Sequence, residues 1–116
     1  GEFAWRQNVS QVVAFDNRGI APSDIPAIAA EGYRSIICNR PDGEEPGQPV
    51  YAAVAAAAEQ AGLAVRFIPV VPGQATAQDV AAMTDAMRDL PGPQLAYCRS
   101  GARSAALCSA ALQQAR

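Results

Sequence analysis

The chain has 116 residues and a formal net charge of −2, and half of its residues are apolar. This length suits one domain with its own core, so we predict a single domain over residues 1–116, of which residues 1–3 could be a cloning remnant. A weakly acidic chain creates no field that would attract nucleic acid or an anionic membrane. No apolar run of about 18 residues predicts a membrane span, and no signal-peptide pattern is visible, so a cytoplasmic location is expected.

The chain has three cysteines and no histidine. The cysteines have no C-x-x-C spacing, which argues against a zinc site and favours free thiols in a reducing compartment. We therefore expect no metal and no cofactor. Without histidine, mechanisms that need an imidazole base are excluded. Cys38 lies in an apolar run and is predicted to be in the core, and Cys108 is predicted to lie away from the functional loop.

Strand-like and helix-like segments alternate along the chain, which is typical of a parallel sheet covered by helices. Val9–Phe15 is predicted to be the first strand and, because it contains polar residues, an edge strand. Ala21–Asp24 then opens a short helix, with Ser23 as its N-cap and Gly32 just past its end. Arg34–Asn39 is predicted to be a buried strand.

Arg40–Pro49 is predicted to be a loop, because it is rich in proline, glycine and acidic residues. The helix Val50–Ala61 follows and is stopped by Gly62. Its buried face is predicted to consist of Val50, Val54, Ala57, Ala58 and Ala61. Leu63–Val71 is predicted to be the third strand.

Thr76 is predicted to cap the next helix together with Asp79, in a capping-box arrangement. The apolar stripe of this helix consists of Val80, Met83, Met87 and Leu90. Pro91–Pro93 ends the helix, Leu95–Tyr97 is the fourth strand, and Arg103–Gln114 is the last helix. The prediction is an α/β domain whose central, mostly parallel sheet has four to five strands and is flanked by helices.

Three predicted loops share one edge of this sheet. In open α/β sheets, ligands bind beyond the carboxyl ends of the strands. By that rule Asn39–Glu45, Val71–Ala75 and Cys98–Arg103 lie on the same rim and form one candidate site.

The stretch from Tyr97 to Ser104 reads Tyr-Cys-Arg-Ser-Gly-Ala-Arg-Ser and has the layout of an anion-binding loop with a nucleophile. Backbone N–H groups of the loop and of the following helix start would converge on one point, and the helix dipole adds positive potential there. Cys98 would then be the nucleophile, largely as thiolate. Arg103 would hold the anion with its planar fork of donors. The alternatives are a buried structural thiol for Cys98 and a surface arginine for Arg103.

The residues predicted to bind substrate are Arg99, Ser100, Gly101, Ala102 and Ser104. Arg99 could recognise an anionic substrate or be solvated. Arg40 could help to bind an anion or could pair with Asp42. Asp42 is a candidate general acid, and the alternative is that it belongs with Glu44 and Glu45 to a solvated acidic loop.

Four stretches carry a resemblance to a known family: Ala21–Ile25, Asn39–Pro49, Ile68–Gln74 and Tyr97–Ser104. From about Ile20 to Leu112, the chain resembles the phosphatase-like domain family named for beta-lactamase hydrolase-like proteins. The resemblance implies a compact version of the tyrosine/dual-specificity phosphatase fold. Members occur alone or fused to enzymes of sulfide and persulfide metabolism, which implies sulfur chemistry in addition to phosphate chemistry, and a fused or interacting sulfide-oxidising enzyme as a partner.

The sequence departs from the wider phosphatase pattern in three ways. Four residues separate Cys98 from Arg103, where that pattern has five. Tyr97 stands where a histidine is usual, and the stretch Val71–Gln74 lacks the expected general-acid aspartate. The Cys-Arg-x-Gly-x-Arg form instead resembles the active-site loop of single-domain rhodaneses.

These departures favour sulfur over phosphate as the transferred group. A sulfane sulfur is one atom and its leaving group needs no proton, whereas a phosphoryl group has three equatorial oxygens and benefits from an acid. The first hypothesis is a sulfurtransferase that moves sulfur from thiosulfate or a persulfide to a small thiol such as glutathione, through a Cys98 persulfide. The alternatives are a phosphatase acting through a Cys98 phosphocysteine on a phosphate ester, with Asp42 as its acid, and a non-catalytic domain that binds an anion or persulfide for a larger enzyme.

Overall fold

A computed structural model of the protein describes residues 13–15 and 19–114. Its strands are β1 (Val13–Phe15), β2 (Ser35–Cys38), β3 (Ala64–Phe67) and β4 (Gln94–Tyr97). Its helices are the 3-10 turn η1 (Pro22–Asp24), α2 (Ile25–Ala30), α3 (Tyr51–Gln60), α4 (Ala77–Asp89) and α5 (Ala102–Gln114). The described strands form one parallel sheet in the order β1-β4-β2-β3, which confirms the predicted α/β class.

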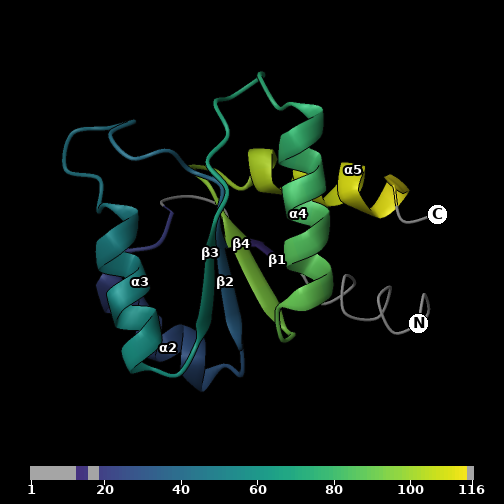
Figure 1. The fold of residues 1–116 in the computed structure, drawn as a ribbon. Coiled ribbons are helices and arrows are strands. Elements are labelled where there is room, and N and C mark those ends of the chain that lie inside the picture. Colours follow the sequence, from purple (N-terminus) through teal and green to yellow (C-terminus); the bar gives the residue numbers. More distant parts are fainter. Residues whose placement is uncertain (1–12, 16–18, 115–116) are drawn as a thin grey trace.

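Helices cover both faces of the sheet, with α2 and α3 on one side and α4 and α5 on the other (Figure 1). Because side chains alternate along a strand, β2 and β4 contribute to two cores. Ile37 and Ala96 pack against α4 and α5, whereas Ile36 and Leu95 pack against α2 and α3. Both strands are buried along their whole length, as is typical of parallel sheets covered on both faces.

The N-terminal part differs from the prediction at one cap. Ser23 is exposed and is not the N-cap, because the chain enters α2 through η1, where Asp24 Oδ2 accepts the Ala21 N–H at 2.9 Å. A cap at Ser23 would meet Pro26 at its third position, which has no N–H to donate. Gly32 follows the helix with φ +100°, as predicted. The β1 strand lies at an edge of the described sheet, and the predicted strand residues 9–12 lie outside the described residues.

The α3–β3 unit is shorter than predicted. Val50 is the N-cap of α3 and is half exposed, so its predicted place on the buried face is wrong, and Ala61 is also exposed. The strand β3 ends at Phe67. Pairing with the β2 exit nevertheless continues, since Val70 N–H donates to Asn39 O at 3.0 Å.

The α4 helix agrees with the prediction. Thr76 Oγ1 accepts the Asp79 N–H at 3.1 Å, and Asp79 Oδ2 accepts the Thr76 N–H at 2.9 Å. Met83 and Met87 of the apolar stripe are fully buried against the sheet. The α5 helix begins at Ala102, one residue earlier than predicted. Within the described residues, none of the helices has the length and apolar content that a membrane crossing requires.

Candidate active site

Cys98 follows the carboxyl end of β4 and is 1% exposed. The loop that it opens turns back on the sulfur, so that Gly101 N–H donates to Sγ at 3.1 Å. Gly101 has φ +92°, a backbone conformation that favours glycine, and it is buried just before the start of α5. The loop therefore directs its backbone N–H groups at the sulfur.

These donors change the acidity of the thiol. Burial raises the pKa of Cys98, but hydrogen bonds from Ser104, through its N–H and its hydroxyl, and from the N–H groups of Ser100 and Gly101 outweigh it. The net result is a pKa below the ordinary cysteine value. The start of α5 adds the positive end of a helix dipole at the same place. The surroundings of Cys98 thus favour the thiolate that the sequence analysis predicted.

Arg103 lies in the first turn of α5 and is held from three sides. Its Nη1 donates to Val70 O at 2.8 Å, to Glu44 Oε2 at 2.8 Å and to Asn39 O at 3.5 Å. Its Nη2 donates to Glu44 Oε1 at 3.3 Å. Among the described residues, no hydrogen bond occupies its Nε, so the edge formed by Nε and Nη2 is available to an anion. This is the edge geometry that binds two oxygens at once.

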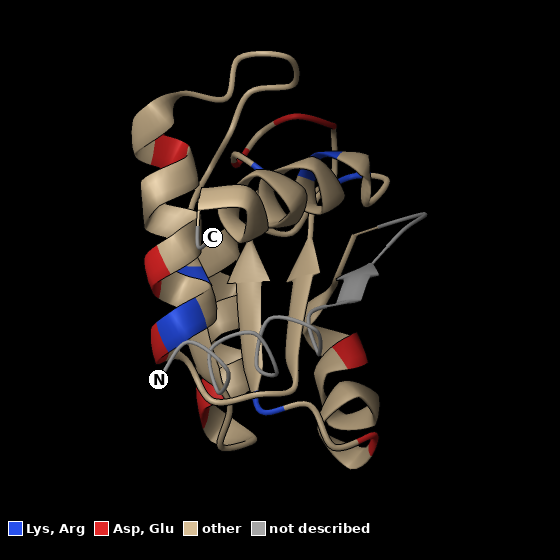
Figure 2. Ribbon diagram, turned by 90° about the vertical axis from the view of Figure 1, so that its right-hand side faces the viewer, with Lys and Arg blue, Asp and Glu red and all other residues tan. Residues whose placement is uncertain are grey.

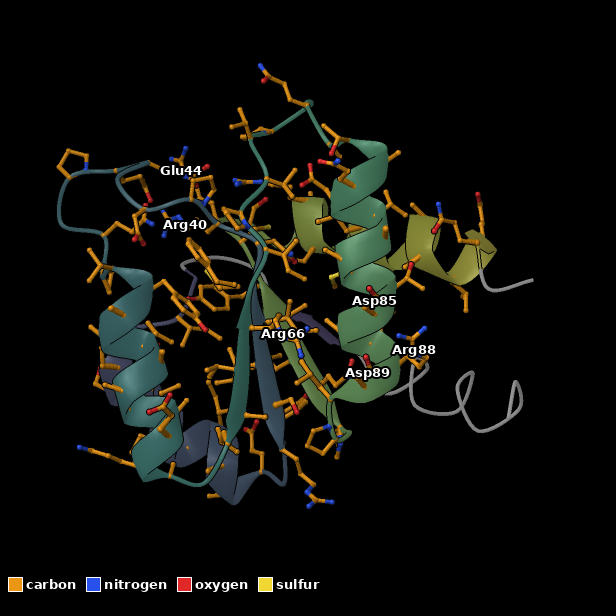
Figure 3. All side chains as sticks on the ribbon, viewed as in Figure 1. Arg40, Glu44, Arg66, Asp85, Arg88 and Asp89 are labelled. Atoms are coloured by element: carbon orange, nitrogen blue, oxygen red, sulfur yellow. The ribbon has the colours of Figure 1, made fainter. Side chains whose placement is uncertain are left out.

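Glu44 and Glu45 form a cluster with the arginines of the rim, so their prediction as a solvated acidic loop is wrong. Arg40, which is 4% exposed, donates from Nε to Glu44 Oε1 at 3.1 Å and also pairs with Glu45. Arg99 Nη2 lies 3.2 Å from Glu45 Oε2, although its side chain is 64% exposed. Figure 3 shows Arg40 and Glu44 close together above the sheet, and Figure 2 shows an acidic loop beside a basic helix start there.

The electrostatic balance of Glu44 is set by two arginines. Burial raises its pKa, but hydrogen bonds and charge attraction from Arg103 and Arg40 outweigh burial and hold the pKa below the usual glutamate value. Sequence reasoning missed this residue because an acidic loop usually faces solvent. The only signal was that Glu44 stands within the Asn39–Pro49 stretch that carried the family resemblance.

Asp42 lies elsewhere in the same loop. Its Oδ1 accepts the Tyr51 N–H at 2.8 Å, at the start of α3, and its side chain is exposed. This bond gives the carboxylate a structural role, and within the described residues no hydrogen bond or ion pair joins it to Cys98 or Arg103. Arg40 pairs with Glu44 and Glu45, so the alternative that it pairs with Asp42 is wrong.

Two further residues that the sequence analysis did not single out support the loop. Asn39 is fully buried at the end of β2, and its Oδ1 accepts the Ser104 hydroxyl at 2.7 Å. Gly19 has φ +70°, and a Cβ at this position would lie 3.2 Å from Arg40 Nη1 and 3.3 Å from Cys98 O. Glycine is therefore required where the chain passes the site.

The structure also places the remaining residues that the sequence analysis discussed. Ser100 is exposed at the loop tip, and Ala102 is exposed at the first position of α5. Cys38 is in the core, as predicted, and burial raises its pKa. Burial raises the pKa of Cys108 to about 11. All three cysteines are free thiols, and among the described residues no three His, Cys, Asp or Glu side chains gather in a way that could hold a metal.

The third predicted segment of the rim, Val71–Ala75, is exposed and does not contact Cys98 through any described hydrogen bond. It instead borders a pocket of about 320 Å³, which small and apolar side chains of this loop, α4 and α5 line beside Arg103. The loop contains no carboxylate. Two of the three predicted segments thus meet directly at Arg103, and the third lies next to it.

Comparison with known proteins shows the family to which the chain belongs. The family model described as "Beta-lactamase hydrolase-like protein, phosphatase-like domain" matches residues 8–116. The beta-lactamase hydrolase-like protein of Agrobacterium fabrum is 42% identical over 85 residues, which cover 73% of this chain and 20% of that protein. The protein of the same name from Xylella fastidiosa strain Temecula1 is 49% identical over 76 residues, covering 66% and 18%. The chain therefore spans about a fifth of the length of these relatives.

Solved structures with a similar fold include two proteins described as candidate phosphatases. The one from Neisseria meningitidis has a TM-score of 0.72 and 36% identity, over 78% of this chain and 64% of that chain. The one from Shewanella putrefaciens has a TM-score of 0.72 and 22% identity, over 90% of this chain and 64% of that chain, and supports the fold alone.

Proposed function

We propose, since the chain belongs to the family of beta-lactamase hydrolase-like phosphatase-like domains, that it is a cysteine-dependent phosphatase with Cys98 as its nucleophile. The observation that carries the proposal is the position of the Cys98 sulfur. The Gly101 N–H donates to it at 3.1 Å, and hydrogen bonds from the loop and from the start of α5 lower its pKa. Arg103 lies in the first turn of the same helix, and its Nε makes no hydrogen bond among the described residues. The comparisons favour this alternative over sulfur transfer.

The reaction runs in two steps. The Cys98 thiolate forms an S–P bond to a bound phosphate ester while the P–O bond to the leaving group breaks, and the leaving group departs with that electron pair. Water then attacks phosphorus, the S–P bond breaks, and its electron pair returns to sulfur. Inorganic phosphate leaves and the proton of the attacking water passes to solvent. Arg103 and the loop N–H groups from Arg99 to Ser104 stabilise the charge on the phosphoryl oxygens in both steps.

The surroundings of the site also limit the substrate class. Val71–Ala75 has no carboxylate, and Asp42 is bonded to the start of α3, so neither of the two positions considered for a general acid protonates a leaving oxygen in the part of the chain that the structure describes. Esters whose leaving group is a weak base, such as aryl phosphates, need this help least. We therefore assign aryl rather than alkyl phosphate esters as substrates.

One observation favours a second function, sulfur transfer. Only four residues separate Cys98 from Arg103, which suits a cargo smaller than a phosphoryl group. In this reaction the thiolate attacks the sulfane sulfur of thiosulfate, the S–S bond breaks, and sulfite leaves with the electron pair. A thiolate such as that of glutathione then attacks the outer sulfur of the Cys98 persulfide and regenerates the Cys98 thiolate.

One experiment tests both functions on the same preparation. Release of phosphate from an aryl phosphate is measured beside transfer of sulfur from thiosulfate to glutathione, with Cys98→Ser as the blank and Cys108→Ser as the matched control. We expect Cys98-dependent phosphate release, with mass spectrometry showing one phosphoryl group trapped on Cys98. Sulfur transfer without phosphate release would make sulfur transfer the function. A folded domain without either activity would instead support an accessory anion-binding role.

A further inference from the structure

The pocket beside Arg103 has no role in the reaction described so far. Its volume is about 320 Å³, and one face of α5 forms a wall of it. Arg103, Ala106, Leu107 and Ala110 make up this wall, because helix residues three and four positions apart lie on the same face. Leu107 is buried, whereas Ala106 is exposed. The pocket therefore rests on the core at one side and opens to solvent at the other.

The remaining sides of the pocket come from the chain between β3 and α4 and from the start of α4. Val70 is buried in the core, and Val80 is half-buried against it. Gly73 and Ala75 belong to the exposed loop that rises beside α4 in Figure 1. Glycine has no side chain and alanine has only a methyl group. The space between this loop and α5 is therefore left unfilled.

The chemistry of the lining selects an apolar occupant. Among the described residues that line the pocket, Arg103 carries the charge, and the side chains of the others are apolar or, for Gly73, absent. A polar group that entered the pocket away from Arg103 would lose its water without gaining a side-chain partner. An apolar group would gain free energy in proportion to the surface that it buries. The pocket thus matches a ligand with an apolar body and an anionic end at Arg103.

Arg103 connects the pocket to the candidate active site. Its Nη1 donates to Val70 O and Glu44 Oε2, whereas its Nε makes no hydrogen bond among the described residues. An anion bound to the edge formed by Nε and Nη2 therefore lies beside a residue that also lines the pocket. In an in-line displacement the leaving group departs from the side of phosphorus opposite the attacking atom. Cys98 is not among the described residues that line the pocket, in agreement with this geometry.

We propose that this pocket binds an aromatic group of two fused rings, which is the leaving group of the phosphate ester held at Arg103. The proposal rests on the proposed function and narrows its substrates from aryl phosphates in general to those with a two-ring aryl group. A dry apolar cavity of about 150 Å³ holds one benzene ring, so a pocket of about 320 Å³ has room for a second.

The first test measures binding and needs no activity. Methylphosphonate, phenylphosphonate and naphthylphosphonate carry the same anionic group, and their P–C bond is not hydrolysed. Isothermal titration calorimetry of the unmodified protein should show about tenfold tighter binding for each ring, the scale expected for its buried apolar surface. Equal affinity for the three phosphonates would overturn the proposal, because the anion alone would then account for binding.

The second test fills the pocket from the α5 wall. Ala106→Leu and Ala110→Leu should each weaken the binding of naphthylphosphonate about tenfold and leave that of methylphosphonate unchanged. Ala105→Leu is the matched control, because Ala105 lies on the exposed face of the same helix and does not line the pocket. Ala106 is itself exposed, so the fold tolerates a larger side chain there. Unchanged binding of naphthylphosphonate in both pocket variants would place the rings elsewhere and refute the proposal.

The kinetic test separates this proposal from the proposed function. Phenol and naphthol are similarly acidic, so phenyl and naphthyl phosphate differ mainly in the surface that they offer to the pocket. We expect a kcat/KM about tenfold higher for naphthyl phosphate, and we expect Ala106→Leu to remove this difference. Turnover of both esters at equal kcat/KM would leave the proposed function standing and contradict the pocket assignment. Ring-dependent phosphonate binding without turnover of either ester would keep the pocket assignment and end the proposed function.

A second copy of the chain is the competing occupant, and sedimentation of the same variants tests for it. We expect the unmodified protein and Ala106→Leu to sediment alike. A dimer that dissociates in Ala106→Leu, without ring-dependent binding of the phosphonates, would assign the pocket to an interface between copies and overturn the proposal.

Discussion

The exits of β2 and β4 lie side by side, and each carries a cysteine and an arginine. At the β2 exit, Cys38 is the last strand residue and Arg40 is buried among carboxylates. At the β4 exit, Cys98 is the first residue after the strand and Arg99 is exposed. Because Cys38 pairs with Tyr97 in the sheet, the two cysteines differ by one position in register.

This shift of one residue gives the two thiols opposite chemistry. Cys38 faces the core beneath α2 and α3, where burial raises its pKa and outweighs the opposing hydrogen bond from Tyr97. Cys98 leaves the strand where the loop and α5 direct donors at it, and its pKa is lowered despite burial. Burial alone therefore makes an unreactive thiol, and a focus of N–H groups is needed to make a reactive one.

The largest effect should come from replacing each of the two cysteines separately. Cys98→Ser should abolish turnover of the aryl phosphate while the circular dichroism spectrum stays unchanged. Cys38→Ala should keep the activity and lower the free energy of unfolding by about 1 kcal/mol. Activity retained in Cys98→Ser would remove Cys98 as the nucleophile, and activity lost in a folded Cys38→Ala would show that the β2 exit takes part in the chemistry.

Substitution of Arg103 tests whether the β2 exit contributes to activity at the β4 exit. Arg103 belongs to α5, yet its Nη1 donates to the Asn39 carbonyl at the β2 exit. Lysine cannot reproduce its planar fork, so Arg103→Lys should lower kcat/KM at least tenfold, or about 1.4 kcal/mol of transition-state binding. Arg88→Lys on the exposed face of α4 is the control. A change smaller than about twofold in Arg103→Lys would mean that the fork does not bind the anion.

The acidity difference itself can be measured by alkylation. Iodoacetamide at mildly acidic pH should modify Cys98 first, since its pKa is lowered while that of Cys38 is raised and that of Cys108 lies at about 11. The rate advantage should be about tenfold, because a lower pKa also reduces the intrinsic reactivity of the thiolate. Peptide mapping at several times gives the order. Equal rates for the three thiols in the folded protein would refute the activation of Cys98.

Substitution of Glu44 should have the smallest effect on kcat/KM, and it tests whether the acidic loop holds Arg103 in place. Glu44→Gln weakens the hold on Arg103 and should lower kcat/KM severalfold, whereas Glu45→Gln, which leaves the Arg103 contacts intact, should change it less. The lowered pKa of Glu44 means that its ionised form stabilises the fold above its ordinary pKa, and that this contribution is lost as the pH falls through the lowered value.

Denaturation at several pH values checks this sign. The difference in free energy of unfolding between the unmodified protein and Glu44→Gln should be full at neutral pH and should shrink below about pH 4.3, where carboxylates take up protons. A difference that grows as the pH falls would contradict the ion pairs with Arg103 and Arg40.

The sequence by itself determined the α/β class, the rim on which the site lies and the loop from Cys98 to Arg103. These follow from local patterns: apolar runs, the Thr76–Asp79 cap, and a glycine-containing loop between a strand and a helix. The same local patterns misplaced the cap at Ser23, which the nearby Pro26 argues against, and the burial of Val50, which is the half-exposed N-cap of α3.

Only the tertiary structure decided which side chains lie around the loop from Cys98 to Arg103. Glu44 meets Arg103 across 59 positions of the chain, and Asn39 meets Ser104 across 65. No local rule connects residues so far apart, since their contact depends on the order of β2 and β4 in the sheet and on the angle at which α5 leaves it. The sequence identified the loop from Cys98 to Arg103, and the packing of the strand exits brought Glu44 and Asn39 to it.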